Sequence, residues 1–228
     1  MTAPAAGPLL RLTALGGAAA LSKLTSFTAK GTYEGFDSDF AQVPIDIYAK
    51  APDMRTTVVH MISGDATSTY NGHEAWSAGP EDLVPLPVVQ ILGQDLQQAR
   101  LDAQLAFPGQ LKQALTGWRA GFPSVTIDGR TLDVISGNMA DGSRVKLYFD
   151  KQTGLLARQV RYANTLVGTI PSHVTYSDYR AVDGVKIPFQ WQVTWVDGQS
   201  TIKLTSVQPN AAIDPAKFSK PPARAAKK

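Results

Sequence analysis

The sequence contains no cysteine. This absence excludes disulfides, thiolate metal sites, a thiol nucleophile and a lipid anchor on an N-terminal cysteine. It also excludes covalent haem attachment through a Cys-x-x-Cys-His motif. A chain without cysteine folds equally well in oxidising and reducing compartments, so the missing residue does not identify the compartment.

Charge is also scarce. Only 18% of the residues are charged, the formal net charge is +3, and the stretch from Pro221 to Lys228 carries three of the cations. The other lysines and arginines are scattered singly, whereas nucleic-acid-binding modules concentrate them on one stripe interleaved with stacking aromatics. We therefore expect no nucleic-acid binding.

Catalytic motifs are missing as well. The three histidines, His60, His73 and His173, lack metal-ligand spacing. No nucleophile elbow, phosphate-binding loop or dinucleotide-binding motif occurs. We expect no enzyme activity, no metal and no cofactor.

Long apolar runs are absent too. No segment approaches the roughly 20 apolar residues that span a bilayer, so we expect no transmembrane segment. Residues 9–24 are the most apolar stretch near the N-terminus, but their cations lie within and after the apolar part. This pattern favours an amphipathic helix over residues 8–24 rather than a signal peptide, and Gly16-Gly17 is an alternative start for that helix.

What the sequence has in abundance is alternation. From Val185 to Trp195 every second side chain is apolar and large. Successive side chains of a strand point to opposite faces, so these residues share one face of an antiparallel sheet. Turn pairs at Asp183-Gly184 and Asp197-Gly198 bound the strand. The shared face comprises Val185, Ile187, Phe189, Trp191, Val193 and Trp195.

Further strands follow from the same pattern. An N-terminal set, separated from the rest by residues 83–118, ends in a hairpin at Asn71-Gly72, a strong turn signal. The predicted strands of this set begin with Ser26–Phe36, Val43–Lys50 and Arg55–Ile62. A C-terminal meander comprises Arg130–Gly137, Ser143–Asp150, Leu155–Ala163, Ile170–Arg180, Val185–Val196 and Thr201–Gln208. We predict a mainly β (α+β) fold: a strongly curved antiparallel sheet or incomplete β-barrel of about 11 strands.

The period changes between the two strand sets. Residues 88–105 and 110–118 favour two helices, divided at Pro108-Gly109. Their apolar side chains need a partner, and the rim of a half-closed barrel offers one. We therefore predict that residues 83–118 form a helical lid.

No composition break marks a domain boundary. We predict a single half-barrel domain over residues 1–220, with the N-terminal helix at one end and the lid inserted mid-chain. Residues 221–228 are predicted to be a flexible basic tail.

Four short motifs, in chain order, match the pattern of one known family. Residues 21–30 resemble its junction between a helix and the first strand, with a Ser-Phe pair at the centre. Residues 47–52 resemble a strand ending in Lys-x-Pro, and residues 69–76 resemble the hairpin that ends in tryptophan. Residues 213–218 resemble the closing Asp-x-x-x-Phe. Together these motifs resemble the LolA/LolB-like superfamily of periplasmic lipoprotein carriers.

The resemblance implies an incomplete β-barrel, closed by helices, that holds acyl chains in an apolar interior in the periplasm. The carriers have an arginine directly before the proline of Lys-x-Pro, tied to lid closure and release. This chain has Ala51 there, with Arg55 nearby but not equivalent. The resemblance therefore leaves lipid or lipoprotein binding as its implication, without that specific carrier cycle.

A second resemblance rests on residues 16–18 with Leu21 and on residues 31–33, 147–150 and 182–189. These stretches resemble the domain behind the haem-binding part of some bacterial proteins named photosynthetic reaction-centre cytochrome c subunits. Without Cys-x-x-Cys-His, this chain would be that domain alone. This resemblance implies an accessory or interaction module.

Two hypotheses follow. The first is a monomeric, non-enzymatic binding protein for a lipid, an acyl chain or a lipoprotein. Its expected ligand-binding residues are Ile45, Ile47, Leu92, Leu96, Val145, Leu147, Phe149, Phe189, Trp191, Val193 and Trp195. The second is an accessory or docking domain, with no ligand of its own, for a periplasmic cytochrome or membrane complex.

Overall fold

The structure is a computed structural model that describes residues 13–80, 86–166 and 168–222. It contains two compact units. Unit 1 holds the described residues of 1–23 and 108–201, and unit 2 holds those of 24–107 and 202–228. The predicted helix start at 8–12, the first lid residues 83–85 and residues 223–228 of the predicted tail lie outside the described residues.

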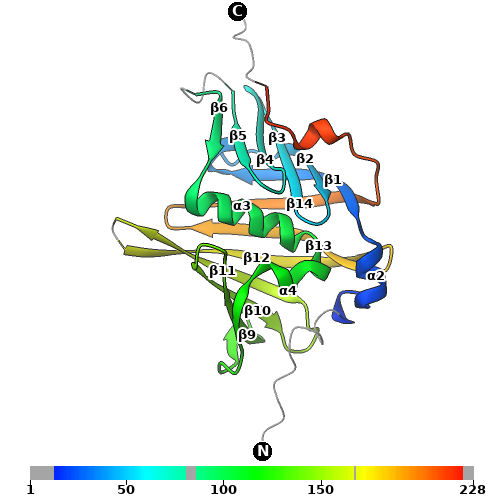
Figure 1. The fold of residues 1–228 in the computed structure, drawn as a ribbon, viewed down its shortest axis with the longest axis vertical. Coiled ribbons are helices and arrows are strands. Elements are labelled where there is room, and N and C mark those ends of the chain that lie inside the picture. The colour runs from blue at the N-terminus through cyan, green and yellow to red at the C-terminus, as the bar shows by residue number, and fades with distance from the viewer. Residues whose placement is uncertain (1–12, 81–85, 167, 223–228) are drawn as a thin grey trace, which may run out of the picture. The chain divides into compact units, whose positions relative to one another are not determined.

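Unit 2 is built on antiparallel strands in the order β6-β5-β4-β3-β2-β1-β14. Helix α3 contacts β3 and β4 and runs past their lower ends in Figure 1. The elements are β1 (Ser26–Gly35), η1 (Phe36–Ser38), β2 (Val43–Lys50), β3 (Met54–Met61), β4 (Gly64–Tyr70), β5 (Ala75–Ala78), β6 (Val88–Ile91), α3 (Gly93–Leu105), β14 (Gly198–Pro209) and η3 (Pro215–Phe218). Strand β14 begins in unit 1 and continues into unit 2 at Ile202.

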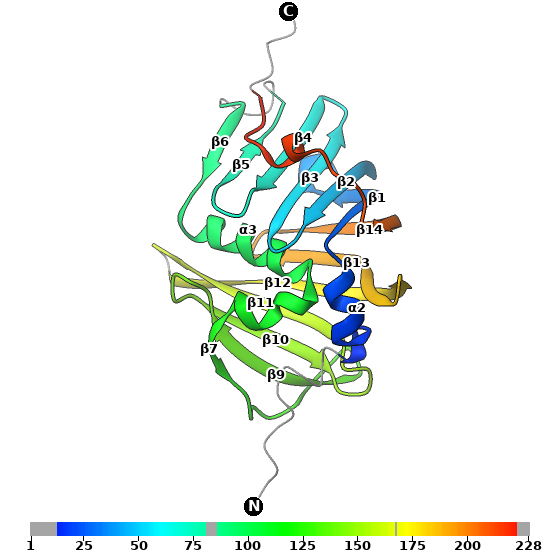
Figure 2. The same cartoon turned by 45° about the vertical axis from the view of Figure 1, so that its right-hand side comes forward.

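Unit 1 is also antiparallel, in the order β13-β12-β11-β10-β9-β7, with β8 paired to β9. Helix α2 lies against β13 (Figure 2). The elements are α2 (Gly17–Lys23), η2 (Pro108–Gln110), α4 (Leu111–Ala114), β7 (Thr116–Arg119), β8 (Val125–Ile127), β9 (Arg130–Asn138), β10 (Arg144–Asp150), β11 (Leu156–Thr165), β12 (Gly168–Val182) and β13 (Val185–Trp195).

The predicted fold class is confirmed. The described residues form a mainly antiparallel β-fold with short helices at the N-terminal and mid-chain positions. In the part of the chain that the structure describes, thirteen of the fourteen strands hydrogen-bond in one order that ends at β6 and β7, and β8 pairs with β9, so the sheet is not closed. The number exceeds the predicted value of about eleven because β6, β7 and β8 come from segments that the sequence did not mark as strands.

The hairpin predicted at the Asn71-Gly72 turn pair is present. Tyr70 pairs with Ala75 across the loop that contains Asn71-Gly72. The Asn71 side chain accepts hydrogen bonds from the backbone N–H groups of His73 and Glu74 at 2.9 and 2.8 Å. This Asx-type turn fixes the register of β4 and β5.

Among the described residues, the N-terminal helix is interrupted at residues 15–16 and starts again at Gly17, which agrees with the alternative start predicted at Gly16-Gly17. Instead of a helix over 8–24, Thr13 and Ala14 are helical, a turn follows, and α2 begins at Gly17. The break has a steric cause: Gly16 has φ +120°, and a Cβ on it would lie 2.0 Å from the carbonyl oxygen of Gly184. The Leu15 carbonyl next to it accepts the Lys186 N–H at 2.9 Å. Glycine therefore lets this segment touch the β12–β13 turn.

The first predicted lid helix, 88–105, is wrong at its start. Residues Val88–Ile91 form β6, which pairs with β5, and α3 begins only at Gly93. Valine and isoleucine favour strands, and the free edge of β5 offers them backbone partners. Gly93, with φ +58°, ends the extended conformation.

The second predicted helix, 110–118, is also largely wrong. Helix α4 ends at Ala114, and Trp118 lies on strand β7. Gly117, with φ +59°, lies within β7 at an irregularity in the pairing with β9. Glycine tolerates this conformation, so the chain can leave the helix after one turn.

Candidate functional site

The predicted ligand-binding residues fall in both units, and each group is described within its own unit. In unit 2, Ile45 and Ile47 are each 1% exposed on β2. They alternate with the half-buried Asp46 and Tyr48, so they point to the opposite face. Both isoleucines are therefore deep in the apolar face of this unit.

Helix α3 is fixed to unit 2 by an apolar and a polar contact. Ala103 of α3 forms a buried cluster with Tyr70 and Ala75 of β4 and β5. The Arg55 guanidinium on β3 donates to the Asp102 carbonyl oxygen of α3 at 3.3 Å. Helix and strands thus share a packed contact.

The structure separates the two predicted lid residues. Leu96 packs against the cluster of Tyr70, Ala75 and Ala103. Leu92 precedes α3 and is 65% exposed. Of the two leucines, Leu96 is the one packed against the strands.

In unit 1 the predicted residues form a gradient of burial. Val145, Leu147 and Phe149 on β10 are at most 2% exposed. Along β13, Phe189 is buried, Trp191 and Val193 are half-buried, and Trp195 is 37% exposed. Cross-strand pairing connects Trp191 to Tyr176, and the apolar surface therefore continues from the core toward the end of β13.

Sequence reasoning missed two polar residues on this same face. Gln159 and Arg161 on β11 are 0% and 5% exposed. They pair with Leu147 and Val145, so their side chains lie among the apolar residues of β10. Burying an amide or a guanidinium among apolar side chains costs free energy unless its polar atoms are hydrogen-bonded.

A tight turn sets the register that buries Gln159. The Asp150 carboxylate accepts hydrogen bonds from the Thr153 backbone and hydroxyl and from the Gln152 backbone. These bonds, the Thr153 backbone N–H first, lower the pKa of Asp150. Because β11 follows this turn directly, the turn and the cross-strand pairing place Gln159 opposite Leu147.

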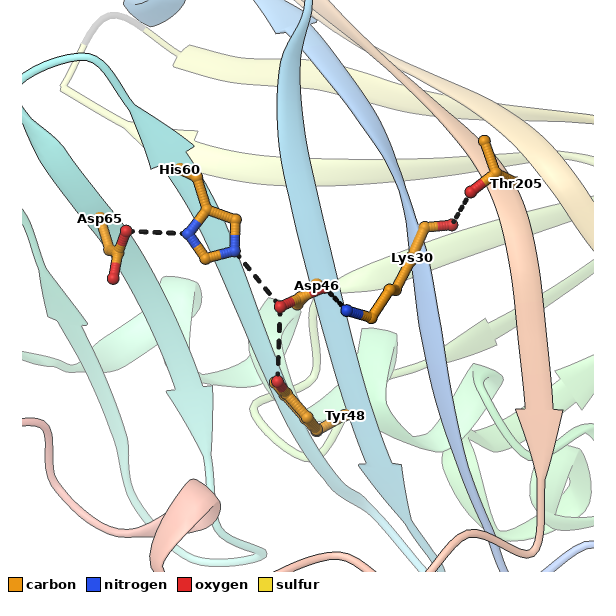
Figure 3. A network of polar contacts seen from close by, with 6 residues as sticks. All are labelled: Lys30, Asp46, Tyr48, His60, Asp65 and Thr205. Atoms are coloured by element: carbon orange, nitrogen blue, oxygen red, sulfur yellow. Dashed lines mark hydrogen bonds and ion pairs between the residues drawn. The ribbon is translucent and has the colours of Figure 1, made fainter.

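The opposite face of unit 2 carries a polar row, shown in Figure 3. The imidazole of His60 contacts Asp65 Oδ1 at 2.8 Å and Asp46 Oδ2 at 3.3 Å. Lys30, the register partner of Asp46, places its ammonium 3.9 Å from Asp46 Oδ1. The hydrogen bond to Asp65, followed by the contact with Asp46, raises the pKa of His60.

This row is a network of contacts between neighbouring strands. His60 has carboxylates at both ring nitrogens, with Tyr48 also reaching Asp46 at 3.5 Å. Within the described residues, no group of three or more His, Asp or Glu side chains is arranged to hold a metal ion. None of the described helices has both the length and the apolar character needed to cross a bilayer.

Comparison with known proteins gives no match to a family model or to a curated protein sequence. Solved structures do match. A LolA superfamily protein from Nitrosomonas europaea has TM-score 0.60 and 15% identity, over 96% of this chain and 99% of that one. A DUF1329 family protein from Desulfovibrio piger has TM-score 0.63 and 13% identity, over 96% and 98%.

A third similar structure is a putative outer membrane lipoprotein-sorting protein domain from Vibrio parahaemolyticus. It has TM-score 0.60 and 10% identity, over 92% of this chain and 94% of that one. All three alignments extend over nearly the whole of both chains. This chain therefore has the fold of LolA superfamily and lipoprotein-sorting domain proteins.

Proposed function

We propose that this chain is a non-enzymatic binding protein for a hydrophobic ligand: a lipid, an acyl chain or a lipoprotein. The observation that carries the proposal is the near-complete structural match to a LolA superfamily protein and a lipoprotein-sorting domain. The same neighbours support a location outside the cytoplasm, in the periplasm. The proposed ligand contacts remain the eleven predicted residues, from Ile45 to Trp195.

The gradient along β13 supports this proposal. Aromatic and aliphatic side chains that are only half-buried, as Trp191 and Val193 are, offer apolar surface continuous with a buried face. Burying further apolar surface under an acyl chain contributes about 25 cal/mol per Å². The more deeply buried positions, such as Leu147, become accessible only if a covering segment moves.

The test is direct detection of ligand. Native mass spectrometry after gentle purification should show co-purified lipid, and the apolar dye N-phenyl-1-naphthylamine should become fluorescent on binding. Trp191→Gln should weaken dye binding, whereas Gln192→Ala, on the other face of the same strand, should leave it unchanged. A lipid-free wild-type protein that fails to bind the dye contradicts the proposal.

A second candidate function is an accessory or docking domain for a periplasmic cytochrome or membrane complex. The loop after β1 favours it: Phe36 and Phe40 are 72% and 55% exposed and meet edge to face at 6.5 Å. Ser38 fixes this loop through hydrogen bonds to Gly35 and Ala41. Exposed aromatics on a rigid loop are typical of contact surfaces.

The two candidates give different outcomes in one experiment. Phe36→Ser with Phe40→Ser removes the exposed pair without touching the buried faces. If docking is the function, this variant loses retention in the membrane-associated fraction of the native cell, while dye binding does not occur in any variant. If ligand binding is the function, the double variant binds the dye as the wild type does.

A further inference from the structure

The side chain of Gln159 is the most deeply buried polar group of unit 1. It has no exposed surface, and its cross-strand partners are the apolar Leu147 on β10 and Val174 on β12. Leu147 and Val174 are 0% and 3% exposed. The amide of Gln159 therefore lies between buried apolar side chains.

Only one end of this amide is satisfied. The Tyr176 hydroxyl donates to Gln159 Oε1 at 3.0 Å, and Nε2 has no hydrogen-bond partner among the described residues. Turning the amide over does not solve the problem, because Tyr176 can then serve Nε2 and Oε1 is left over. Most buried polar groups in folded proteins are paired, so one orphaned end calls for an explanation.

The surroundings indicate what the missing partner is. With Tyr176 on the oxygen, the open position is an N–H donor, which requires an acceptor oxygen. Arg161 lies two residues after Gln159 on β11, on the same face. Its buried guanidinium favours hydrogen-bond acceptors, such as carbonyl and carboxylate oxygens, nearby. Trp191 and Val193, the partners of Tyr176 and Val174, supply the adjoining apolar surface.

We propose that the Gln159 amide N–H is the hydrogen-bonding point for the carbonyl oxygen of an acyl ligand. This inference rests on the proposed ligand-binding function and specifies it: the protein selects chains that end in a carboxylate, ester or amide over pure hydrocarbons. The apolar face supplies affinity through buried area, and the single amide fixes where the acyl head lies along the face.

A near-isosteric substitution isolates this amide. Gln159→Met keeps the volume and removes both the N–H donors and the carbonyl. Gln192→Leu is the matched control, because Gln192 lies on β13 with its side chain on the opposite face, where it reaches Gln199. Cooperative thermal unfolding of both variants verifies that each is folded.

The probes are dodecanoic acid, methyl dodecanoate and N-phenyl-1-naphthylamine, of which the last lacks a carbonyl. Affinities for the first two come from displacement of the dye. In Gln159→Met we expect about three- to tenfold weaker binding of both acyl compounds, the value of one hydrogen bond, with dye affinity unchanged. Gln192→Leu should bind all three as the wild type does. A larger loss for the acid than for the ester assigns a carboxylate, and equal losses assign the carbonyl.

Other results overturn the inference in distinguishable ways. One such result is that Gln159→Met binds all three probes as the wild type does, or loses affinity for all three equally. In either case the amide does not recognise the acyl carbonyl, while the proposed ligand-binding function still holds. If the wild type binds none of the probes, the proposed function fails and the inference fails with it.

Discussion

The two units bury one face of their strands in different ways. Unit 2 buries an apolar row on β2, in which Ile45, Ile47 and Ala49 are at most 1% exposed, and places its charged network on the opposite face. Unit 1 buries Gln159 and Arg161 directly beside Val145 and Leu147.

This difference in buried residues distinguishes a face that serves packing from a face that can serve ligand recognition. An apolar face is stabilised by burial alone and tolerates apolar exchanges of similar volume. A buried amide adds no such stability unless both of its ends are paired, so its presence points to specificity rather than to packing. Unit 2 is therefore the more conventional core, and under the proposed function unit 1 is the unit that distinguishes ligands.

The largest expected effect tests whether unit 2 is such a core. Leu96→Asp places a carboxylate against the cluster of Tyr70, Ala75 and Ala103. We expect the free energy of unfolding to fall by about 3 kcal/mol, because Leu96 is partly buried and the carboxylate would lie against apolar side chains. Leu92→Asp should change it by less than about 0.5 kcal/mol, because Leu92 is 65% exposed. Urea unfolding monitored by circular dichroism measures both.

A different outcome for this pair would sharpen the comparison. If Leu96→Asp retains full stability but loses dye binding, α3 is a movable lid rather than a part of the core. Loss of fold and binding together in Leu96→Asp alone identifies α3 as a permanent element of unit 2.

The next effect concerns the contact of the N-terminal segment in unit 1. Gly16→Ala should destabilise the protein by about 2–3 kcal/mol, because its Cβ would lie 2.0 Å from the Gly184 carbonyl oxygen and the turn must shift. Gly17→Ala is the control. Gly17 also has positive φ, +82°, but nothing lies within 4 Å of a Cβ there, so only the backbone strain of about 1 kcal/mol remains. Equal losses of melting temperature in the two variants would show that the close approach to Gly184 is not tight.

The smallest expected effect is on the pH dependence of folding stability, to which His60 in unit 2 and His173 in unit 1 contribute with opposite sign. The pKa of His60 in unit 2 is raised, so its stabilising contribution is complete below its ordinary value of about 6.5 and is lost as the pH rises through the folded pKa. The pKa of His173 in unit 1 is lowered, by burial first and by Arg158 second. The cost of charging His173 therefore appears as the pH falls through about 6.5.

Two variants measure these contributions separately. The stability difference between wild type and His60→Gln should shrink by about 0.5 kcal/mol between pH 6 and pH 9, a small value because His60 is partly exposed. The wild type should lose stability relative to His173→Gln as the pH falls from 8 to 5.5. Thermal unfolding across pH reports both, and a dependence of the same sign in both variants would contradict the assignment of the two environments.

The strands and turns that could be predicted from the sequence are those whose own residues determine their conformation. The alternation from Val185 to Trp195 predicted β13, and turn pairs such as Asn71-Gly72 predicted the hairpins. Strand β6 was misread because Val88–Ile91 is short and apolar, and its conformation is decided by the free edge of β5. The hydrophobic pattern of a short segment does not show whether a strand with a free edge lies beside it in the fold.

The buried polar pair was missed for a related reason. On β11 the larger apolar residues, Leu156 and Val160, alternate with Gln159 and Arg161, so hydropathy alone points the wrong face inward. The burial of Gln159 and Arg161 depends on the Asp150 turn and on pairing with β10 and β12. Register with neighbouring strands would have been needed to find them.

The contact of Gly16 with Gly184 has a consequence for synthesis on the ribosome. Unit 1 joins the first described residues to residues 108–201, and unit 2 joins 24–107 to residues after 201, so the two units are interleaved along the chain. The segment around Gly16 is translated long before Gly184 and cannot reach it until the β12–β13 turn has been translated. Folding of this chain therefore depends on late, long-range pairing, which is slow and leaves nascent apolar strands exposed to chaperones.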